Sequence, residues 1–492
     1  MKSKINLRHI FILPAFLLLT ITGCNTEELL NPLPPTLLAE RDAFATPSRV
    51  LLQVNGLYSS LKSGQFLGGR VQMYNEVRGA DFQNRLGNGV TGLFAWSYNQ
   101  LATNAEPVNV WTNGFLTINR CNVFLKGLDD NPNAVDAATA NRYRAEARFI
   151  RAVAYYFLVN IYARPFALNN GSSPGLPLRL LSETAPANRD LARSTVAEVY
   201  AQIIQDLNFA ETNLPMTYPS ALLNVSRVHR NGAIAFKTRV YLATQRYADV
   251  VTEAKKIASQ TAAPFSATSG VPHALASNIL TVFAPPYTSS ESIFSLPMTT
   301  NDVPGVQNGL GFYFNRPGAG NGNGEYYLDP GTQGILNNPA FTATDVRRTG
   351  LLVTVGGLNY VRKYPLNPFT DFPPVTRYAE VLLNYAEALA RVNTAAADPI
   401  ALSLLNAVRG RSAPTAVYAG FATSDELTNA ILLERRIELM TEGFRGIDIT
   451  RLAQPLPAKS GVQGSIPITA QQYVWPIPQV ELDNNKLMVQ NN

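Results

Sequence analysis

The sequence predicts a mostly α-helical fold built from helix–turn–helix pairs. Segments with apolar residues at helical spacing occur in both halves of the 492-residue chain. Small alanines and large tyrosines occupy their packing positions, which is typical of tetratricopeptide-like repeats. The hydrophobic content of 46% and the charged content of 15% are those of a globular protein. Because one helix pair cannot bury its apolar face alone, several pairs must stack.

The first 23 residues have the pattern of a lipoprotein signal peptide. Three basic residues precede the apolar run IFILPAFLLLTIT, which is too short for a membrane span. Cys24 follows in a lipobox pattern, which predicts cleavage before Cys24 and lipidation of its thiol and amine. An ordinary signal peptide followed by a fortuitous cysteine is the alternative. Residues 24–40 then form a lipidated, proline-rich tether.

The composition of the mature chain excludes several partners and sites. Its 38 basic residues face 35 acidic ones, and no basic run or basic helix appears, so nucleic acid is not an expected partner. Once Cys24 is lipidated, Cys121 has no cysteine to pair with, so stability must come from the core. His229 and His273 are the histidines of the mature chain, and no HExxH or CxxC motif exists. We therefore expect no metal site and no cofactor, with a calcium site made of carboxylates left open.

The expected helices follow one another along the chain. They cover residues 142–162, 193–210, 229–259, 377–392 and 423–440. Two of them begin with a capping box, Thr195 with Glu198 and Thr423 with Glu426. The stretch 229–259 is predicted to be two helices joined near Gln245.

Long irregular stretches separate these helices, at 64–105, 163–190 and about 260–375. The last is rich in Gly, Pro, Asn and aromatic residues, with strand-like runs such as SIFSLPM and LLVTVGGLNYVRKY. Loops of this length usually carry function or form a subdomain of their own. We therefore expect a binding site to lie in these stretches.

Two loop motifs resemble catalytic signatures but lack the structural context that those need. GSSPG around Ser173 matches G-x-S-x-G, yet no strand precedes it and no helical pattern follows it. RPGAGNGNGEYY lacks the Lys-Ser/Thr of a phosphate-binding loop. We interpret the first as a turn-rich loop and the second as a flexible loop that presents Tyr326 and Tyr327.

The most charged stretch is ERRIELMTEGFRGIDITR. Glu434, Glu438 and Glu442 are four residues apart and share one stripe of a helix. A glycosidase needs two carboxyl groups that flank the bond, and nearby arginines would lower the pKa that a general acid needs raised. Gly443 and Gly446 are expected to end the helix. We predict a structural ion-pair network made of Glu434, Arg435, Glu438, Glu442 and Arg445.

Aromatic residues of the irregular stretches suit a sugar site. Trp96, in FAWSYNQ, is expected to be exposed, so that its ring can stack on the apolar face of a pyranose. Polar neighbours would bind hydroxyl groups, and later loop aromatics would form a facing wall. The alternative is that these aromatics pack on the body of the protein. The candidate ligand-binding residues are Tyr74, Arg78, Asp81, Trp96, Tyr98, Asn99, Phe312, Tyr313, Tyr326 and Tyr327.

Taken in order, several segments resemble the SusD/RagB family of outer-membrane nutrient-binding lipoproteins. The matching segments are AEARFIRAVAYYFLVNIYARPFAL, RSTVAEVYAQIIQDLNFAETNLP, SESIFSL, RYAEVLLNYAEALARVN, LNAVRGRS, LLERRIELMTEGFRGIDITRL and YVWPIPQVELDNNKLMVQN. Their order and spacing over nearly the whole mature chain are specific, although no single segment is. One departure is Ala163 and Arg164, where a Gly-Asp-like pair is commoner in the family.

The resemblance implies about four tetratricopeptide-like helix pairs with a loop-rich region of short strands laid over them. It divides the chain into an N-terminal SusD-like region, 41–260, and a C-terminal SusD/RagB region, 261–492. It implies a non-catalytic lipoprotein, anchored in the outer membrane and exposed at the cell surface. Such a protein binds a nutrient and passes it to a TonB-dependent, SusC-like β-barrel.

The nutrient implied by the resemblance is an oligosaccharide, with a peptide, as in RagB-type capture, as the alternative. Two further hypotheses are a surface glycosidase that acts through paired acids and a scaffold that binds only protein through its repeats. A cleft with free polar and aromatic groups would favour ligand capture over both of them.

Overall fold

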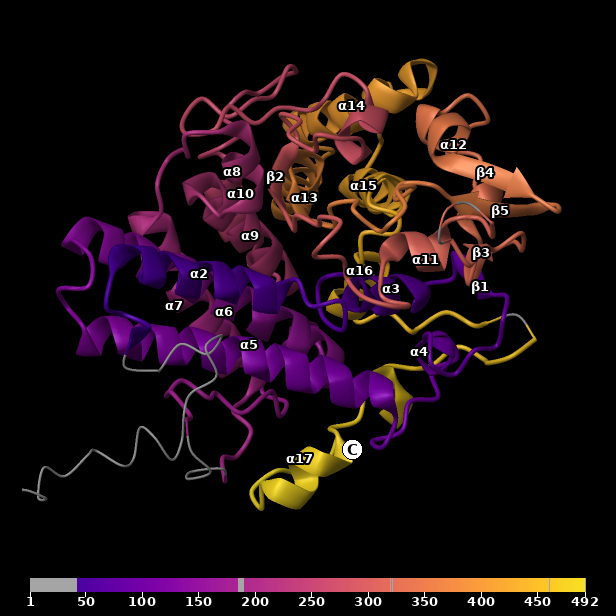
Figure 1. The fold of residues 1–492 in the computed structure, drawn as a ribbon. Helices are drawn as coiled ribbons and strands as arrows, with labels where there is room; N and C mark the ends of the chain where they lie inside the picture. Colours follow the sequence, from indigo (N-terminus) through magenta and orange to yellow (C-terminus); the bar gives the residue numbers. More distant parts are fainter. Residues whose placement is uncertain (1–41, 185–189, 319, 321, 460, 492) are drawn as a thin grey trace, which may run out of the picture.

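The computed structural model describes residues 42–184, 190–318, 320, 322–459 and 461–491. The predicted signal peptide, Cys24 and the tether lie outside the described residues. Helices dominate the described chain, and its strands are short and few (Figure 1), which confirms the mostly α prediction.

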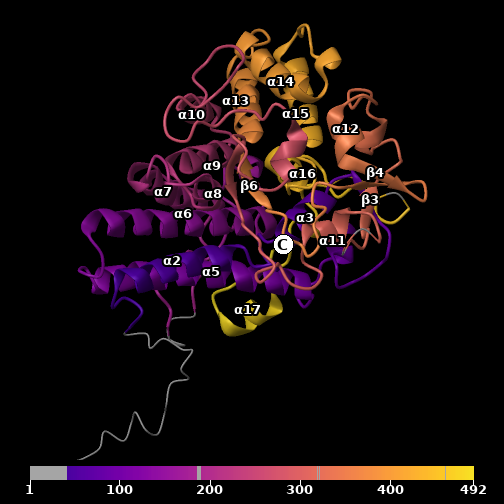
Figure 2. The same cartoon turned by 45° about the horizontal axis from the view of Figure 1, so that its top comes forward.

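The scaffold is a row of helices in which each packs on the next (Figures 1 and 2). Eight helices, from α5 to α15, form this row in the described residues, and successive neighbours make four pairs, which confirms the predicted repeat architecture. A preceding helix, α2 (Pro47–Leu61), packs on α5 and α6. The members of the row are α5 (Ala105–Asp130), α6 (Ala137–Tyr162), α7 (Val196–Asn213), α9 (Arg230–Ala243), α10 (Tyr247–Ala254), α13 (Tyr378–Val392), α14 (Pro399–Ser412) and α15 (Ser424–Glu438).

The local signals in the sequence place the helix ends. Both predicted capping boxes are present, because the Thr195 and Thr423 side chains accept from the backbone N–H three residues on and the glutamate reaches back. Gln245 adopts φ +58° between α9 and α10, which breaks the helix where the sequence predicted a joint. Aromatic rings of α6 then pack edge-on against Phe236 of α9.

Three two-stranded antiparallel sheets lie in the loop-rich region. Both predicted strand runs are confirmed, SIFSLPM as β2 and LLVTVGGLNYVRKY as the β4–β5 hairpin. Gly356 and Gly357 both have positive φ at the turn of this hairpin, as a two-residue turn requires. The pairs are β1 (Phe82–Asn84) with β3 (Tyr326–Leu328), β2 (Ser292–Ser295) with β6 (Pro374–Arg377), and β4 (Leu352–Val355) with β5 (Leu358–Val361).

Short helices complete the loop-rich region and the C-terminal segment. The α-helices are α3 (Arg70–Val77), α4 (Leu93–Trp96), α8 (Ala221–Ser226), α11 (Leu310–Phe314), α12 (Val346–Leu351), α16 (Arg445–Arg451) and α17 (Gln479–Asn484). The 3-10 helices are η2 (Phe166–Leu168), η3 (Ile279–Phe283), η4 (Ile335–Asn337), η5 (Pro414–Ala416) and η6 (Gln471–Tyr473).

One expected helix end is wrong. Helix α15 stops at Glu438, and Gly443, with φ +84°, lies in the turn that follows. Gly446 is inside α16 and ends no helix. A Cβ on Gly446 would lie 2.5 Å from the backbone oxygen of Asn75, so this glycine lets α16 approach α3 closely.

The largest hydrophobic cluster contains residues from Val50 to Met488 and so spans almost the whole described chain. A second cluster lies around α13, α14 and α15. The division into 41–260 and 261–492 stays a prediction. Among the described helices, none combines the length and apolar character needed to cross a bilayer.

Candidate ligand-binding site

Most of the predicted binding aromatics are buried. Trp96 is 4% exposed, and its indole N–H donates to the Phe82 carbonyl oxygen at 2.8 Å. Tyr74, Tyr313 and Tyr326 are buried completely or nearly so. The expected exposure of Trp96 is therefore wrong, because α4 directs this ring inward to a backbone partner.

Tyr326 does not stand on a flexible loop. It lies in β3 opposite Asn84, and its hydroxyl group donates to the Thr91 carbonyl oxygen at 3.1 Å. The Gly-rich stretch thus leads into a strand, which corrects the loop interpretation for Tyr326 and Tyr327 alike. Phe312 and Tyr327 are half-buried, and neither lines the pocket described below.

Asp81 is 1% exposed and belongs to an ion-pair group. Arg436 donates to its carboxylate at 2.9 Å, the backbone N–H of Ile335 donates at 3.0 Å, and Arg445 lies 3.7 Å away. These contacts leave little of the carboxylate for a sugar hydroxyl. Asp81 is therefore placed to hold α15 and α16 against β1.

Arg78, Tyr98 and Asn99 come together in one pocket with a volume of about 280 Å³. Ala95 and residues 98–102 form one wall, and residues 471, 472 and 474–476 with Gln490 and Asn491 form the other. In Figure 1 the C-terminal segment, in yellow, passes close to α4 at this place. The backbone N–H of Gln479 donates to the Ala102 carbonyl oxygen at 3.0 Å and fixes the two walls together.

Three polar side chains of the pocket make no hydrogen bond at all to the described residues: the amides of Asn99 and Gln472 and the indole of Trp475. Asn99 and Gln472 are exposed, whereas Trp475 is 3% exposed and packs edge-on against Tyr74 at 5.0 Å. The pocket therefore offers amide and indole groups beside aromatic surface, which is the combination that binds hydroxyl groups and apolar ring faces.

Other amides hold the wall in place. Gln490 exchanges hydrogen bonds with the backbone of Ile477 at 2.7 and 2.9 Å. Asn491 donates to the carbonyl oxygens of Tyr162 and Trp475, both at 2.8 Å. These bonds fix Trp475 at the end of α6, so the C-terminal wall is preorganised.

Two buried cations stand at the base of the pocket. Arg78 is 2% exposed and donates to the Tyr473 carbonyl oxygen at 2.7 Å, and burial lowers its pKa. Behind it, Lys459 lies 5.8 Å from the Trp96 ring centre and 5.2 Å from that of Tyr98. Burial lowers the pKa of Lys459 to about 7. The Trp96 ring therefore contacts the ammonium group of Lys459 behind the pocket, and Trp96 is not one of the residues that line the pocket.

Sequence reasoning missed the C-terminal wall. Gln471, Gln472 and Trp475 occur in TAQQYVWPIP, which mixes amides and aromatics in the same way as FAWSYNQ. This similarity in composition to FAWSYNQ could have identified them as candidate binding residues. Their closeness to Arg78 could not be read from the sequence, because nearly 400 residues separate the two segments.

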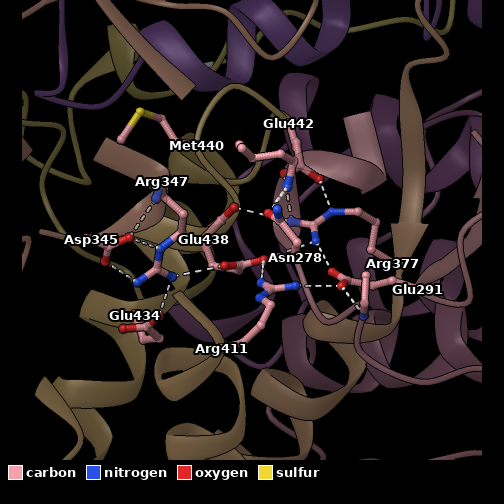
Figure 3. A network of polar contacts seen from close by, with 12 residues as sticks. Asn278, Glu291, Asp345, Arg347, Arg377, Arg411, Glu434, Glu438, Met440 and Glu442 are labelled. Carbon is pink, nitrogen blue, oxygen red and sulfur yellow. Dashed lines mark hydrogen bonds and ion pairs between the residues drawn. The ribbon is translucent and has the colours of Figure 1, made fainter. Parts of the chain in front are cut away.

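The acidic residues predicted to share one helical stripe lie elsewhere and are buried (Figure 3). Glu434 and Glu438 are on α15, whereas Glu442 lies in the turn after it, so the stripe is shorter than predicted. Arg347 donates to Glu438 at 2.9 Å, and Arg377 donates to Glu442 at 2.7 Å. Burial by itself would raise the pKa values of Glu438 and Glu442, but the neighbouring cations outweigh it and hold both below the usual range. The further pairs are Arg409 with Glu434, Lys363 with Glu442, Arg411 with Glu438, Arg435 with Asp448, and Arg445 with Asp81.

Replacing Trp96 by phenylalanine should destabilise the protein without touching the pocket. The change leaves the buried Phe82 carbonyl oxygen without its donor, which should cost about 1–3 kcal/mol of unfolding free energy. Urea unfolding followed by far-UV circular dichroism measures this change. An unchanged midpoint would contradict the structural role assigned to the indole N–H.

Comparison with known proteins gives two family matches along the chain. Residues 64–242 match a SusD-like family described as "Starch-binding associating with outer membrane", and residues 370–492 match the SusD family. "SusD-like protein P2" from Formosa agariphila is 25% identical over 528 aligned positions, which cover 97% of each chain.

Solved structures have the same fold. A SusD superfamily protein from Bacteroides fragilis is 31% identical, with a TM-score of 0.80 over 91% of this chain and 100% of that one. A "Laminarin binding SusD-like protein" is 22% identical, with a TM-score of 0.70 over 91% of this chain and 99% of that one. With family matches in both halves and full coverage of a relative above 30% identity, the chain belongs to the SusD family.

Proposed function

We propose that this protein captures an oligosaccharide in the pocket between residues 95–102 and 471–476 and hands it to a TonB-dependent, SusC-like outer-membrane barrel. The observation that carries the proposal is the set of unpartnered polar groups on Asn99, Gln472 and Trp475, which face one pocket with aromatic surface. Sugars present hydroxyl groups and apolar ring faces together, so this lining suits them.

The size of the pocket indicates how a glycan binds. A volume of about 280 Å³ is at the small end for ligand pockets. A long polymer does not fit inside it, so we propose that the pocket holds the end or one exposed unit of a chain. A larger groove of about 730 Å³, between α2 and α5, contains none of the predicted binding residues.

The family supports a glycan over a peptide. One family match is described as starch-binding, and one structural neighbour is named for laminarin. At 22% identity that neighbour shares the fold alone and does not identify the glycan. A ligand screen in which the protein binds peptides would therefore contradict the proposal.

Capture is proposed to be non-catalytic. Glu434, Glu438 and Glu442 are fully buried and ion-paired. A general acid needs access to the substrate and a pKa near neutrality. None of the three carboxyl groups is accessible, and the neighbouring cations hold the pKa values of Glu438 and Glu442 below the usual range. The proposed anchor is a lipid on Cys24, which would hold the protein at the outer-membrane surface beside its barrel.

Removing the free amides should weaken glycan binding. We expect Asn99→Ala and Gln472→Ala each to lower affinity by roughly fivefold to tenfold, since each deletes about one hydrogen bond of about 1–1.5 kcal/mol. Isothermal titration calorimetry with glycans selected in an array screen measures the change. The double variant should lose the product of the two effects if both amides bind the same ligand.

Asn429→Ala is the matched control, because Asn429 is an exposed amide on α15, outside the residues that line the pocket. It should leave affinity unchanged. Unaltered binding in the Asn99 and Gln472 double variant would remove this pocket from the function. Binding of peptides but no glycan would replace the glycan by a peptide.

A further inference from the structure

The buried arginines of this protein have a common pattern of partners. Most of those in the described residues contact a carboxylate, which offsets the cost of burying the charge. Arg70 does not, but its guanidinium group donates to Asn308, Tyr74 and two backbone oxygens. The carboxylate-paired arginines are Arg151, Arg239, Arg347, Arg377, Arg409, Arg435 and Arg451.

Arg78 departs from this pattern and lies in the pocket wall. Its Nη2 donates to the Tyr473 carbonyl oxygen at 2.7 Å, while its Nη1 is buried with no hydrogen-bond partner among the described residues. No carboxylate of the described chain contacts it, and the residues that line the pocket include no acid. A buried guanidinium N–H without an acceptor is costly unless an acceptor arrives with a ligand.

The groups around the pocket leave it positive. Arg78 is joined by Lys459 behind Tyr98 and by Arg445 on α16. Asp81 faces this group, but it already pairs with Arg436 and Arg445. A buried pocket wall of this sign focuses the field on a bound anion.

One acid contacts the lining from behind. Glu106, in the first turn of α5, accepts a hydrogen bond from the Gln100 side chain, and Gln100 lines the pocket. Burial raises the pKa of Glu106 to about 7, so it carries only part of a charge at neutral pH. Lys459, whose pKa burial lowers to about 7, is likewise only partly charged, so the positive charge of the pocket wall rests mainly on Arg78, which no carboxylate of the described chain contacts.

We infer that this pocket binds a sugar unit that bears a carboxylate, so that the captured glycan contains uronic acid. The carboxylate would accept from Nη1 of Arg78 in a charge-assisted hydrogen bond. The Trp475 indole N–H and the Asn99 amide remain for the hydroxyl groups of the same unit. This inference rests on the proposed function and names the class of its ligand.

The test compares ligands that differ only in charge. Polygalacturonate, alginate and glucuronoxylan are each used beside a carboxyl-reduced form, in which the uronic acids have become neutral sugars. Affinity electrophoresis and calorimetry on the wild-type protein measure binding. We expect at least one acidic polymer to bind tenfold or more tighter than its reduced form. Equal binding of the acidic and reduced forms would overturn the inference.

Variants of Arg78 test whether this residue causes the tighter binding of the acidic polymer. Arg78→Gln should bind the acidic and the reduced polymer alike, whereas Arg78→Lys should keep part of the preference. Arg144→Gln is the control, because Arg144 pairs with Asp129 of α5 and lies at the end of α6 opposite to Tyr162. Retention of the full preference in Arg78→Gln would overturn the assignment. Where Arg78→Gln fails to fold, the wild-type comparison decides by itself.

The possible results distinguish a failure of this inference from a failure of the proposed function. Binding of laminarin, starch or another neutral glycan, with none of the three acidic polymers bound, would overturn the inference and leave glycan capture standing. Failure to bind any neutral or acidic glycan would overturn the proposed function and the inference with it.

Discussion

Replacing Glu438 by alanine is expected to lower the free energy of unfolding by about 3–5 kcal/mol, the scale for removing one partner of a buried ion pair. The Glu438 side chain is fully buried and contacts three guanidinium groups, those of Arg347, Arg377 and Arg411 (Figure 3). Its loss leaves buried positive charge without compensation, which is worse than losing a surface pair worth less than about 1 kcal/mol.

Urea unfolding of the Glu438→Ala protein measures the effect, with Asn429→Ala as the control on the solvent-exposed side of the same helix. Glu438→Gln should also destabilise, because it keeps the shape but removes the charge. A loss of less than about 1 kcal/mol for alanine would show that water or a rearranged acid compensates the three cations. Glycan affinity of the folded protein should not change, since the network does not line the pocket.

A buried pair of histidines is expected to lose its contribution to stability on acidification. His229 and His273 are at most 1% exposed, with their Nε2 atoms 3.3 Å apart. The Nδ1–H of His273 donates to the Ser290 carbonyl oxygen, so its Nε2 accepts a hydrogen bond from the Nε2–H of His229 and both rings are neutral. Burial lowers the pKa of His229 to about 3 and that of His273 to about 4.

The sign of the effect follows from these values. An unfolded histidine titrates near pH 6.5, so on acidification the unfolded chain takes up protons before the folded one does. The contribution of the pair to stability is complete above pH 6.5 and is lost as the pH falls toward 4. At pH 4 the loss is on the order of 3 kcal/mol for each histidine.

Other buried groups act in the opposite direction. Burial raises the pKa values of Glu76 and Glu106 to about 7 and that of Asp371 to about 6, so these carboxyl groups stabilise the fold as the pH falls. The measurement therefore compares slopes. The unfolding free energy of the wild type minus that of the double variant His229→Gln, His273→Gln should decrease between pH 7.5 and 4, whichever way the carboxyl groups tilt both curves. Parallel curves would contradict the role of the pair.

The helices were predictable because their signals are local. Capping residues, the joint at Gln245 and the i, i+4 stripe of α15 all depend on residues within a few positions of each other. The β4–β5 hairpin was visible for the same reason, as two strand-like runs around a Gly-Gly turn. Such patterns do not depend on what packs against them.

The candidate site was only partly predictable because it depends on distant contacts. Arg78, Tyr98 and Asn99 were placed in a sugar site by composition, and they do line one pocket. Trp96, two positions before Tyr98, points the other way because its N–H finds a backbone acceptor in β1. Composition indicates which loop is rich in binding chemistry, but the direction of each ring depends on the tertiary partners of that loop.

The Gln479–Ala102 and Asn491–Tyr162 hydrogen bonds make occupancy of the pocket inseparable from docking of the C-terminal segment. A state in which the helices are intact but this segment has lifted away has only half a pocket. A glycan that binds only the docked state therefore lowers the population of the lifted state by mass action. The backbone N–H of Trp475 donates to the Ile161 carbonyl oxygen, and this bond breaks when the segment lifts away. The rate of hydrogen exchange at this amide should therefore fall as the fraction of protein with bound glycan rises.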